Sequence, residues 1–567
     1  MNTCSVCENE FEDEYFNTEQ QKCILHSEKI YSSVIDDDNS KYFYYALLDY
    51  ITPQVLRSSE EYKMSIDPEH QKVVIWNFLD NIENDDQTIN INEALKNKIT
   101  LKDIRFPVHG SLNREYNYVN ILNKLTIIEF KNCVFEDEIL LNNEKNLLFR
   151  RCTFTGDWHH IICKEIKYRE CKFENFIIIN PSENKLIVEN HLLYNCGFRN
   201  IQCSGARFKK RLFTFNNINN YKKIEKIELI YCEFDEDFIL TITDNDNKED
   251  KEYFEVSSIN FEHSIFNGKV KLQYCDIKEK ASFYNTKFKD LADFYRTKFH
   301  EVVFERTDFE NVAVFSEAVF NQNLNFKYAK FLGYSVFRDT IIKGKLDLRN
   351  TIFDAEADAN FLDITSEERK KDPETKEFYG EAKVIQVANR ETARLIKSFY
   401  EYSNNIIESN KFYALEMKER EKELDKSFKD RKNLIEWVIF KLHGLSSNHS
   451  QDPVTPILWI LNIAFIYSMW ISSPQLDHVL SYLSCLIVLF AIRSKNKWYY
   501  KTILIGNLFL PILASYVTLA IIADKINPFS IMTSKDPITF GLLLFKVTIA
   551  YLIYQFIVSV RQNTRRK

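Results

Sequence analysis

Between residues 261 and 353, a bulky apolar residue recurs at every fifth or sixth position. Eighteen positions share this spacing: Phe261, Phe266, Leu272, Ile277, Phe283, Phe288, Phe294, Phe299, Phe304, Phe309, Phe315, Phe320, Phe326, Phe331, Phe337, Ile342, Leu348 and Phe353. Two positions before each of them stands a second residue that is mostly small or β-branched, and polar residues lie between. An α-helix repeats its apolar face every 3.6 residues and a simple strand every two, so neither element explains the pattern.

A unit of five or six residues fits one short side of a coil that turns at each corner. The bulky residue and the small residue before it point inward, whereas residues such as Lys298 and Asp308 face water. Four such sides close a square coil of ~22 residues, and coils stack ~4.8 Å apart because their strands share backbone hydrogen bonds. The mixed spacing predicts bulges at some corners. We therefore expect a β-solenoid with a filled interior.

The same pattern extends upstream with longer insertions. It recurs in five short segments: FKNCVF (Phe130–Phe135), FRRCTF (Phe149–Phe154), YRECKF (Tyr168–Phe173), LYNCGF (Leu193–Phe198) and LIYCEF (Leu229–Phe234). A cysteine holds the small inward position in each segment, and we interpret this column as buried apolar side chains rather than a metal or redox path. His159, His160 and Cys163 lack further ligands at metal-binding spacing. The solenoid is expected to span residues 126–364.

A central Phe or Leu with a small residue two places earlier resembles the pentapeptide-repeat family, whose fold is a right-handed quadrilateral β-helix. The resemblance implies a rod without a natural pocket, which favours recognition of a protein partner over catalysis. No GxGxxG, Walker-type, GxSxG or HExxH motif is present, so we expect no enzyme activity. Soluble relatives that mimic DNA and bind gyrase have acidic faces, whereas residues 259–363 contain 15 Lys and Arg against 16 Asp and Glu. The balanced charge therefore makes a gyrase-binding DNA mimic the least favoured of three possible functions.

The chain opens with two pairs of metal-ligand residues in the spacing C-x2-C-x15-C-x2-H. Cys4 and Cys7 form the first pair, and Cys23 and His26 form the second. Together they can hold one Zn²⁺ in a closed tetrahedral site without a position for water, which is typical of structural zinc. A redox CxxC would not explain the second pair. We expect a zinc-finger-like module over residues 1–30, with a role in capping or partner docking.

The segments on either side of the solenoid are predicted to be helical. In residues 31–125, Lys41–Ile51 and Lys72–Ile82 are typical of short helices that could cap the exposed edge of the first coil. After the solenoid, Asn389–Lys426 has helical apolar spacing interrupted near Ser403, which predicts a helical hairpin within a connector over residues 365–430. Its charged stretch, Glu416–Leu424, is interpreted as a solvated helix face.

Four apolar runs predict a membrane domain over residues 431–567 with four transmembrane helices. They are roughly Val454–Ser472, Leu476–Ile492, Thr502–Ala523 and Thr539–Val560. The third and fourth reach the ~20 residues that a bilayer crossing needs, and the second is marginal. We count the second run as a transmembrane helix because four spans place all the strongly basic segments on one side of the membrane. The positive-inside rule then puts both termini and the solenoid in the cytoplasm. The resemblance to bacterial members of the pentapeptide-repeat family implies that the membrane is a bacterial inner membrane.

Before the first run, Leu434–Leu445 is typical of an amphipathic helix that lies at a membrane interface. The connector and membrane part resemble those of bacterial family members that carry channel-like domains, but the loop before the last run lacks their TVGYG-like filter. Lys546 in the fourth run and Asn507 in the third are polar residues at membrane depth, which makes them functional candidates.

The sequence favours two functions. The first is a non-enzymatic, membrane-anchored scaffold or sensor whose solenoid binds a protein partner. The second is a channel-like effector gated by the solenoid, which would require a homo-oligomer because four helices rarely enclose a pore. The net charge of −7 argues against a nucleic-acid partner in either case.

Overall fold

The structure is a computed structural model of the 567-residue chain. It describes residues 2–27, 37–57, 68–80, 95, 97–107, 116–136, 138–139, 141, 145–160, 165–179, 186–214, 223–240, 253–354, 359–368, 370–371, 378–379, 383–429, 433–471 and 539–564. The chain divides into two compact units, Met1–Gln386 and Val387–Lys567.

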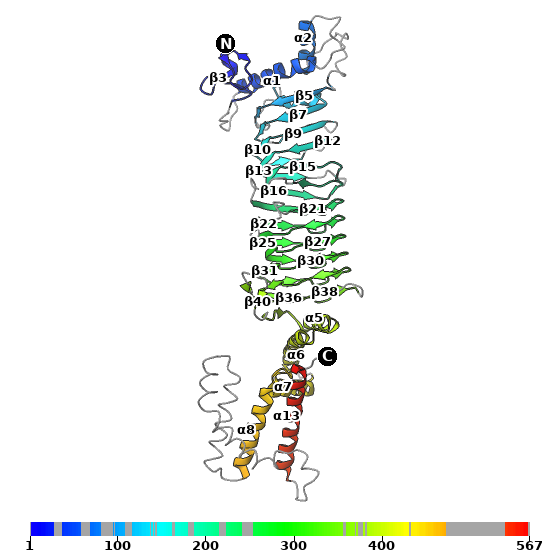
Figure 1. Cartoon of the computed structure of the whole chain (residues 1–567). Helices are drawn as coiled ribbons and strands as arrows, with labels where there is room; N and C mark the ends of the chain where they lie inside the picture. The colour runs from blue at the N-terminus through cyan, green and yellow to red at the C-terminus, as the bar shows by residue number, and fades with distance from the viewer. Residues whose placement is uncertain are drawn as a thin grey trace. The chain divides into compact units, whose positions relative to one another are not determined.

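The first unit is built around a parallel β-solenoid, whose strands stack one above the next in Figure 1. In its later part each coil contributes four short strands, β29 (Asp308–Phe309), β30 (Ala313–Val314), β31 (Val319–Phe320) and β32 (Leu324–Asn325). These pair one coil further on with β33 (Lys330–Phe331), β34 (Ser335–Val336), β35 (Ile341–Ile342) and β36 (Lys345–Asp347). Because each strand pairs with the fourth strand after it, the coil has four sides, as the sequence spacing predicts.

Four parallel sheets run along the solenoid. The first contains β5 (Lys98–Lys102), β7 (Ile127–Lys131), β9 (Asn146–Arg150), β12 (Glu165–Arg169), β15 (Leu193–Tyr194) and β18 (Phe213–Thr214). The second contains β14 (Leu186–Val188), β17 (Ala206–Phe208), β20 (Glu233–Phe234), β23 (Ile265–Phe266), β26 (Lys287–Phe288), β29, β33 and β37 (Ile352–Phe353). The third contains β21 (Phe238–Ile239), β24 (Val270–Lys271), β27 (Ala292–Asp293), β30, β34 and β38 (Ala359–Asn360).

The fourth sheet is the longest because several of its strands continue around a corner. It includes β6 (Arg105–Phe106), β8 (Val134–Phe135), β10 (Thr153–Phe154), β11 (Trp158–His159), β13 (Lys172–Ile179), β16 (Gly197–Ser204), β19 (Lys223–Ile230), β22 (Phe254–Asn260), β25 (Cys275–Ser282), β28 (Lys298–Val303), β31, β32, β35 and β36. Its register shifts between Ile277 and Lys280, which agrees with the predicted bulges at some corners.

The interior is filled by stacked aromatic rings. The eight phenylalanines Phe294, Phe299, Phe304, Phe309, Phe315, Phe320, Phe326 and Phe331 are each at most 1% exposed. Each ring stacks on the equivalent ring of a neighbouring coil, for example Phe299 on Phe320 with centroids 5.2 Å apart and planes 2° apart. Rings on adjacent sides of one coil meet edge to face, as Phe299 and Phe304 do at 6.1 Å. The core is therefore continuous along the solenoid.

The small inward residues also bind the coils to one another. Several donate a side-chain hydrogen bond to the carbonyl of a bulky residue in the preceding coil: Thr286 to Phe261, Thr307 to Phe283, Thr340 to Phe315 and Thr351 to Phe326, at 2.7 to 2.9 Å. Upstream, Cys133 and Cys152 make longer bonds of this kind to Leu101 and Phe130. The position therefore favours a short side chain that can donate a hydrogen bond.

Left-handed residues form the corners of the coils. On some sides of each coil the residue just before the small inward position has positive φ, for example Arg296 (53°), Arg306 (60°) and Tyr328 (60°). This conformation is uncommon for residues other than glycine, and here it recurs once or twice in every coil. The solenoid supports it because the following residues are fixed by hydrogen bonds to neighbouring coils, such as Lys330 N to Thr307 O at 2.9 Å.

The solenoid begins earlier than residue 126, where the sequence analysis places its start. The first strands are β5 and β6, and Leu101-Lys-Asp-Ile104-Arg-Phe106 repeats the upstream pattern with isoleucine in place of cysteine. Helices α1 (Asp37–Arg57) and α2 (Pro68–Leu79) lie near this end (Figure 1), and α4 (Tyr118–Lys124) contacts α1 through Tyr118 and Phe43. Phe43 of α1 packs against Phe106 at 6.2 Å, so α1 contacts the core of the first coil.

Short strands complete the two ends of this unit. The N-terminal segment contains β1 (Asn2–Thr3), β2 (Glu10–Phe11), the 3₁₀ turn η1 (Asp13–Tyr15), β3 (Phe16–Asn17) and β4 (Lys22–Cys23), which form two antiparallel pairs. After the last coil, β39 (Lys370–Lys371) pairs antiparallel with β40 (Phe378–Tyr379). A further short strand, β41 (Gln386–Val387), ends this part of the chain.

The second unit is helical in its described part. It contains α5 (Arg390–Tyr402), α6 (Ile406–Lys429), α7 (Leu434–Ser447), α8 (Val454–Ile471) and α13 (Phe540–Thr564). Helices α5 and α6 form the predicted hairpin, in which Tyr400 stacks on Phe412 at 5.5 Å. Phe545 and Ile549 of α13 pack against Ile460 and Ile463 of α8.

Among the described residues, one helix is long and apolar enough to cross a membrane, Phe540–Gln562. It corresponds to the fourth predicted run. The first run forms α8, and the second and third runs lie outside the described residues, as does Asn507.

Candidate metal centre

Two tight turns near the N-terminus position the four candidate ligands. Cys4 follows β1, and its carbonyl accepts a hydrogen bond from Glu8 N at 2.9 Å, while Val6 N faces its sulfur at 3.5 Å. Cys7 Sγ lies within 4.8 Å of Cys4 Sγ, and Glu8 continues the turn after Cys7 with a φ of 60°. The Cys23 carbonyl accepts hydrogen bonds from the backbone N–H groups of His26 and Ser27, both at 3.0 Å, so His26 returns to the side of Cys23.

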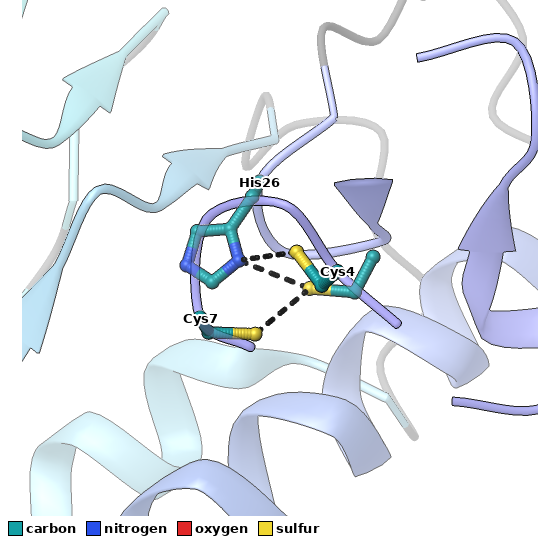
Figure 2. Close-up of side chains that lie close together, drawn as sticks. Cys4, Cys7 and His26 are labelled. Atoms are coloured by element: carbon teal, nitrogen blue, oxygen red, sulfur yellow. Dashed lines mark hydrogen bonds between the residues drawn. The ribbon is translucent and has the colours of Figure 1, made fainter. Parts of the chain in front are cut away.

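The ligand atoms have the spacing of a tetrahedral metal site. His26 Nδ1 lies 3.0 Å from Cys23 Sγ and 3.6 Å from Cys4 Sγ, and Cys7 Sγ lies 3.9 Å from Cys23 Sγ (Figure 2). All four atoms lie within 4.8 Å of one another. Zinc bonds of about 2.3 Å to sulfur and 2.0 Å to nitrogen imply S···S separations of ~3.8 Å and S···N separations of ~3.5 Å in a tetrahedron. Two of the measured distances match these values and one is shorter, so these residues fit a tetrahedral ion.

The pKa values of the three thiols are shifted in different directions. Burial opposes ionisation of Cys4, but backbone N–H groups around its sulfur outweigh burial and lower the pKa of Cys4 to about 6. Burial and the neighbouring sulfurs raise the pKa values of Cys7 and Cys23. Three thiolates at such short distances repel one another, and a divalent cation would neutralise that repulsion.

The centre is attached to the first coil of the solenoid. His26 Nε2 lies 3.3 Å from Lys102 O at the end of β5, and Leu25 O accepts a hydrogen bond from Arg105 N of β6 at 3.1 Å. A hydrogen bond from Nε2–H to this carbonyl would leave Nδ1, the atom nearest the sulfurs, free to bind a metal. The ligand turn and the first two strands are therefore held together.

The other candidate residues that the structure describes do not join a ligand cluster. In the described part of the chain, the one group of three or more potential ligands is the N-terminal group. His159 faces Glu138 at 3.8 Å, burial lowers the pKa of His160 to about 4, and Cys163 lies outside the described residues. Lys546 is 4% exposed on α13.

The cysteine column consists of free, buried thiols, as predicted for Cys133, Cys152, Cys171, Cys196 and Cys232. Burial raises the pKa values of Cys133 and Cys171, which keeps these thiols neutral. The column therefore belongs to the core of the solenoid.

A polar junction between α6 and α7 was not recognised from the sequence. Lys441 Nζ lies 2.6 Å from Glu421 Oε1, and His449 Nε2 lies 3.4 Å from Glu421 Oε2. Glu421 belongs to the stretch interpreted as a solvated helix face. Its partners lie 20 and 28 positions away, and no local periodicity connects them.

Comparison with known proteins supports the interpretation of the repeat. A family model for pentapeptide repeats, described as nine copies, matches residues 304–352. The chain matches no curated protein and no solved structure in the same comparisons. The matched residues include β29 to β36, which form the regular four-sided coils. The chain therefore contains pentapeptide repeats.

Proposed function

We propose that this protein is a non-enzymatic scaffold, anchored in a bacterial inner membrane, whose solenoid binds a protein partner on one of its walls. The observation that carries the proposal is the filled interior. The bulky and small inward residues occupy the interior, so the solenoid offers its outer walls for interaction. Pentapeptide-repeat proteins commonly mediate protein interactions, which agrees with this role.

The charges on the walls favour a protein partner over DNA mimicry. Opposite charges face one another across neighbouring coils, as in Arg296 and Glu317 at 2.9 Å and Arg207 and Asp235 at 3.0 Å. Walls with alternating charges do not imitate a phosphate backbone. They resemble the polar, mixed surfaces on which proteins recognise one another.

Membrane anchoring rests on the C-terminal apolar runs. Helix α13 is long enough to cross a bilayer and exposes large apolar side chains such as Leu544 and Val547, at 59% and 55%. A soluble helix would bury this face. We propose that the four predicted runs all span the membrane and that both chain ends lie in the cytoplasm.

The ion in the N-terminal site is proposed to be Zn²⁺ with a structural role. Three thiolates and one imidazole form a closed donor set of the type that zinc prefers. Since this site is attached to β5 and β6, the ion would hold the N-terminal segment over the open end of the first coil.

A channel-like effector is the second candidate, and the observation that favours it is Lys546. Its side chain is buried on a helix long enough to cross a membrane, and because a charged amine at membrane depth is costly, such residues usually have a function. This role requires an oligomer that encloses a pore.

Charge exchange on one wall tests the scaffold proposal. Lys330 Nζ lies 3.6 Å from Asp308 Oδ1 on the second sheet. Exchanging the two residues (Asp308→Lys with Lys330→Asp) keeps the ion pair and reverses the local charge pattern, so folding should be unchanged. Similar exchanges on each wall should identify one wall where capture of a partner from detergent extract falls at least tenfold.

Two outcomes would contradict the proposal. Recovery of the intact chain in the soluble fraction would exclude membrane anchoring, and undiminished capture after exchanges on all walls would exclude wall recognition. Currents from the purified protein in planar bilayers, abolished by Lys546→Met, would favour the channel instead. Inhibition of gyrase supercoiling would favour DNA mimicry.

A further inference from the structure

Helix α7 exposes a continuous apolar stripe. Six aliphatic residues on one face of the helix are 46% to 79% exposed: Leu434, Ile435, Val438, Ile439, Leu442 and Leu445. Their spacing of one, three or four positions keeps them on one side of an α-helix. Exposed aliphatic residues scattered singly are ordinary, but a stripe along a whole helix marks a surface that contacts something apolar.

The opposite face of α7 is fixed to α6 by polar contacts. Glu436 Oε1 lies 2.6 Å from Arg420 Nη2, and Trp437 Nε1 donates a hydrogen bond to Asp425 at 2.7 Å. Lys441 Nζ lies 2.6 Å from Glu421. These contacts determine the rotation of α7 about its axis. The apolar stripe therefore faces away from α6 as a consequence of specific pairing.

The C-terminal end of α7 is attached to the membrane-length helix. Ser446 Oγ lies 3.3 Å from Tyr551 Oη, and Ser447 Oγ donates to Gln555 Oε1 at 3.1 Å. Tyr551 is the middle residue of the apolar stretch Phe540–Gln562, and Gln555 lies four positions further toward its C-terminal end. Close to them, α13 exposes Tyr554 at 62%. These two bonds attach the C-terminal end of α7 to the middle and C-terminal part of α13.

We propose that the α7 stripe inserts into the acyl–headgroup boundary of an anionic membrane, parallel to its surface. The proposal rests on the membrane anchoring inferred above and adds a second lipid-binding element to it. Lipid fits this face better than a protein partner because the stripe is purely aliphatic, whereas protein interfaces are enriched in aromatic residues and arginine. The four residues Lys429, Asp430, Arg431 and Lys432 before α7 carry a net charge of +2, which complements anionic headgroups.

Photo-crosslinking in phospholipid nanodiscs of phosphatidylethanolamine and phosphatidylglycerol tests this proposal on the full chain. Ile439→p-benzoylphenylalanine places the probe on the stripe, and Trp437→p-benzoylphenylalanine is the matched control on the face toward α6. Val547→p-benzoylphenylalanine on α13 reports membrane insertion independently. We expect lipid adducts at positions 439 and 547, and at position 437 a crosslink to α6, all identified by mass spectrometry.

The outcomes separate the two inferences. Suppose that position 547 gives a lipid adduct. A probe at 439 that then crosslinks to a second copy or to another segment of the chain, or that gives no crosslink, would overturn the assignment of α7 and leave the anchoring intact. No lipid adduct at 547 would overturn the anchoring itself. Leu442→p-benzoylphenylalanine, one turn further on, repeats the measurement if the probe at 439 prevents folding.

Discussion

Replacing Thr307 by valine tests whether the inward hydroxyl groups hold neighbouring coils together. Thr307 is fully buried, and its Oγ1 donates a hydrogen bond to Phe283 O in the preceding coil at 2.8 Å. Valine keeps the size and branching of threonine and removes the donor. Phe283 O still accepts a bond from Thr286 N at 3.1 Å, so the acceptor does not become unpaired. We expect a loss of about 1 kcal/mol of local stability, the usual net value of one hydrogen bond.

Hydrogen exchange on the full chain in detergent is the suitable assay. Each coil contacts its two neighbours, so the local free energy of opening is the relevant quantity rather than one global value. A loss of about 1 kcal/mol makes exchange about fivefold faster. We expect this increase in peptides covering β26 and β29, which flank the lost bond, and no change in peptides covering β7 and β9.

Two control variants decide whether the hydroxyl is responsible. Ser335 holds the small inward position on the third sheet, where its buried Oγ has no hydrogen-bond partner among the described residues. Ser335→Ala should therefore leave exchange unchanged or slow it. Thr307→Ser keeps the donor and removes a methyl group. Wild-type exchange in Thr307→Val, or faster exchange in Thr307→Ser than in Thr307→Val, would refute the hydrogen-bond argument in favour of packing.

The metal centre, a close contact between coils and the contact between α6 and α7 each give a further prediction. His26→Ala should reduce bound zinc below one ion per chain by elemental analysis and speed exchange in β5 and β6; unchanged zinc content would contradict the ligand assignment. Gly333→Ala should destabilise its coil by ~1–3 kcal/mol, since the new Cβ would lie 2.6 Å from the backbone of Asn311. Hydrogen exchange no faster than in wild type would show that the backbone can move away from the new Cβ without loss of stability. Burial opposes ionisation of Glu421, but Lys441 outweighs it and keeps the pKa of Glu421 below its usual 4.5. The stabilisation that Glu421 gives to the contact between α6 and α7 is therefore complete above about pH 4.5 and disappears as the pH falls through the lower folded-state pKa. Acid should therefore speed hydrogen exchange in α7 of the wild type and have a smaller effect in Glu421→Gln. Equal acid sensitivity of the two proteins would argue against the ion pair.

The solenoid could be predicted because its signal is local and repeated. Each phenylalanine must point inward, and the spacing of Phe299, Phe304 and Phe309 states the length of one side directly. Repetition over eighteen positions then excludes other periods. The four metal-ligand candidates could be predicted for a similar reason. Each pair lies within one turn, so Cys4 with Cys7, and Cys23 with His26, are brought together by short-range geometry alone.

The start of the solenoid was misplaced because the pattern weakens there. Ile104 replaces the cysteine of the later units, and a single copy, Leu101 to Phe106, does not stand out from an ordinary apolar segment. Only its pairing with β7 and β8 assigns these residues to the first coil.

The amino-acid sequence by itself determined the period, the inward residues, the ligand pairs and the apolar runs, since each depends on neighbours a few positions apart. Only the tertiary structure decided which contacts join distant segments. It paired the hydroxyl of Thr307 with Phe283, set His26 against Lys102, and bound the polar face of α7 to α6 through Lys441 and Glu421. These contacts depend on the stacking of coils and the rotation of helices, which no local periodicity encodes.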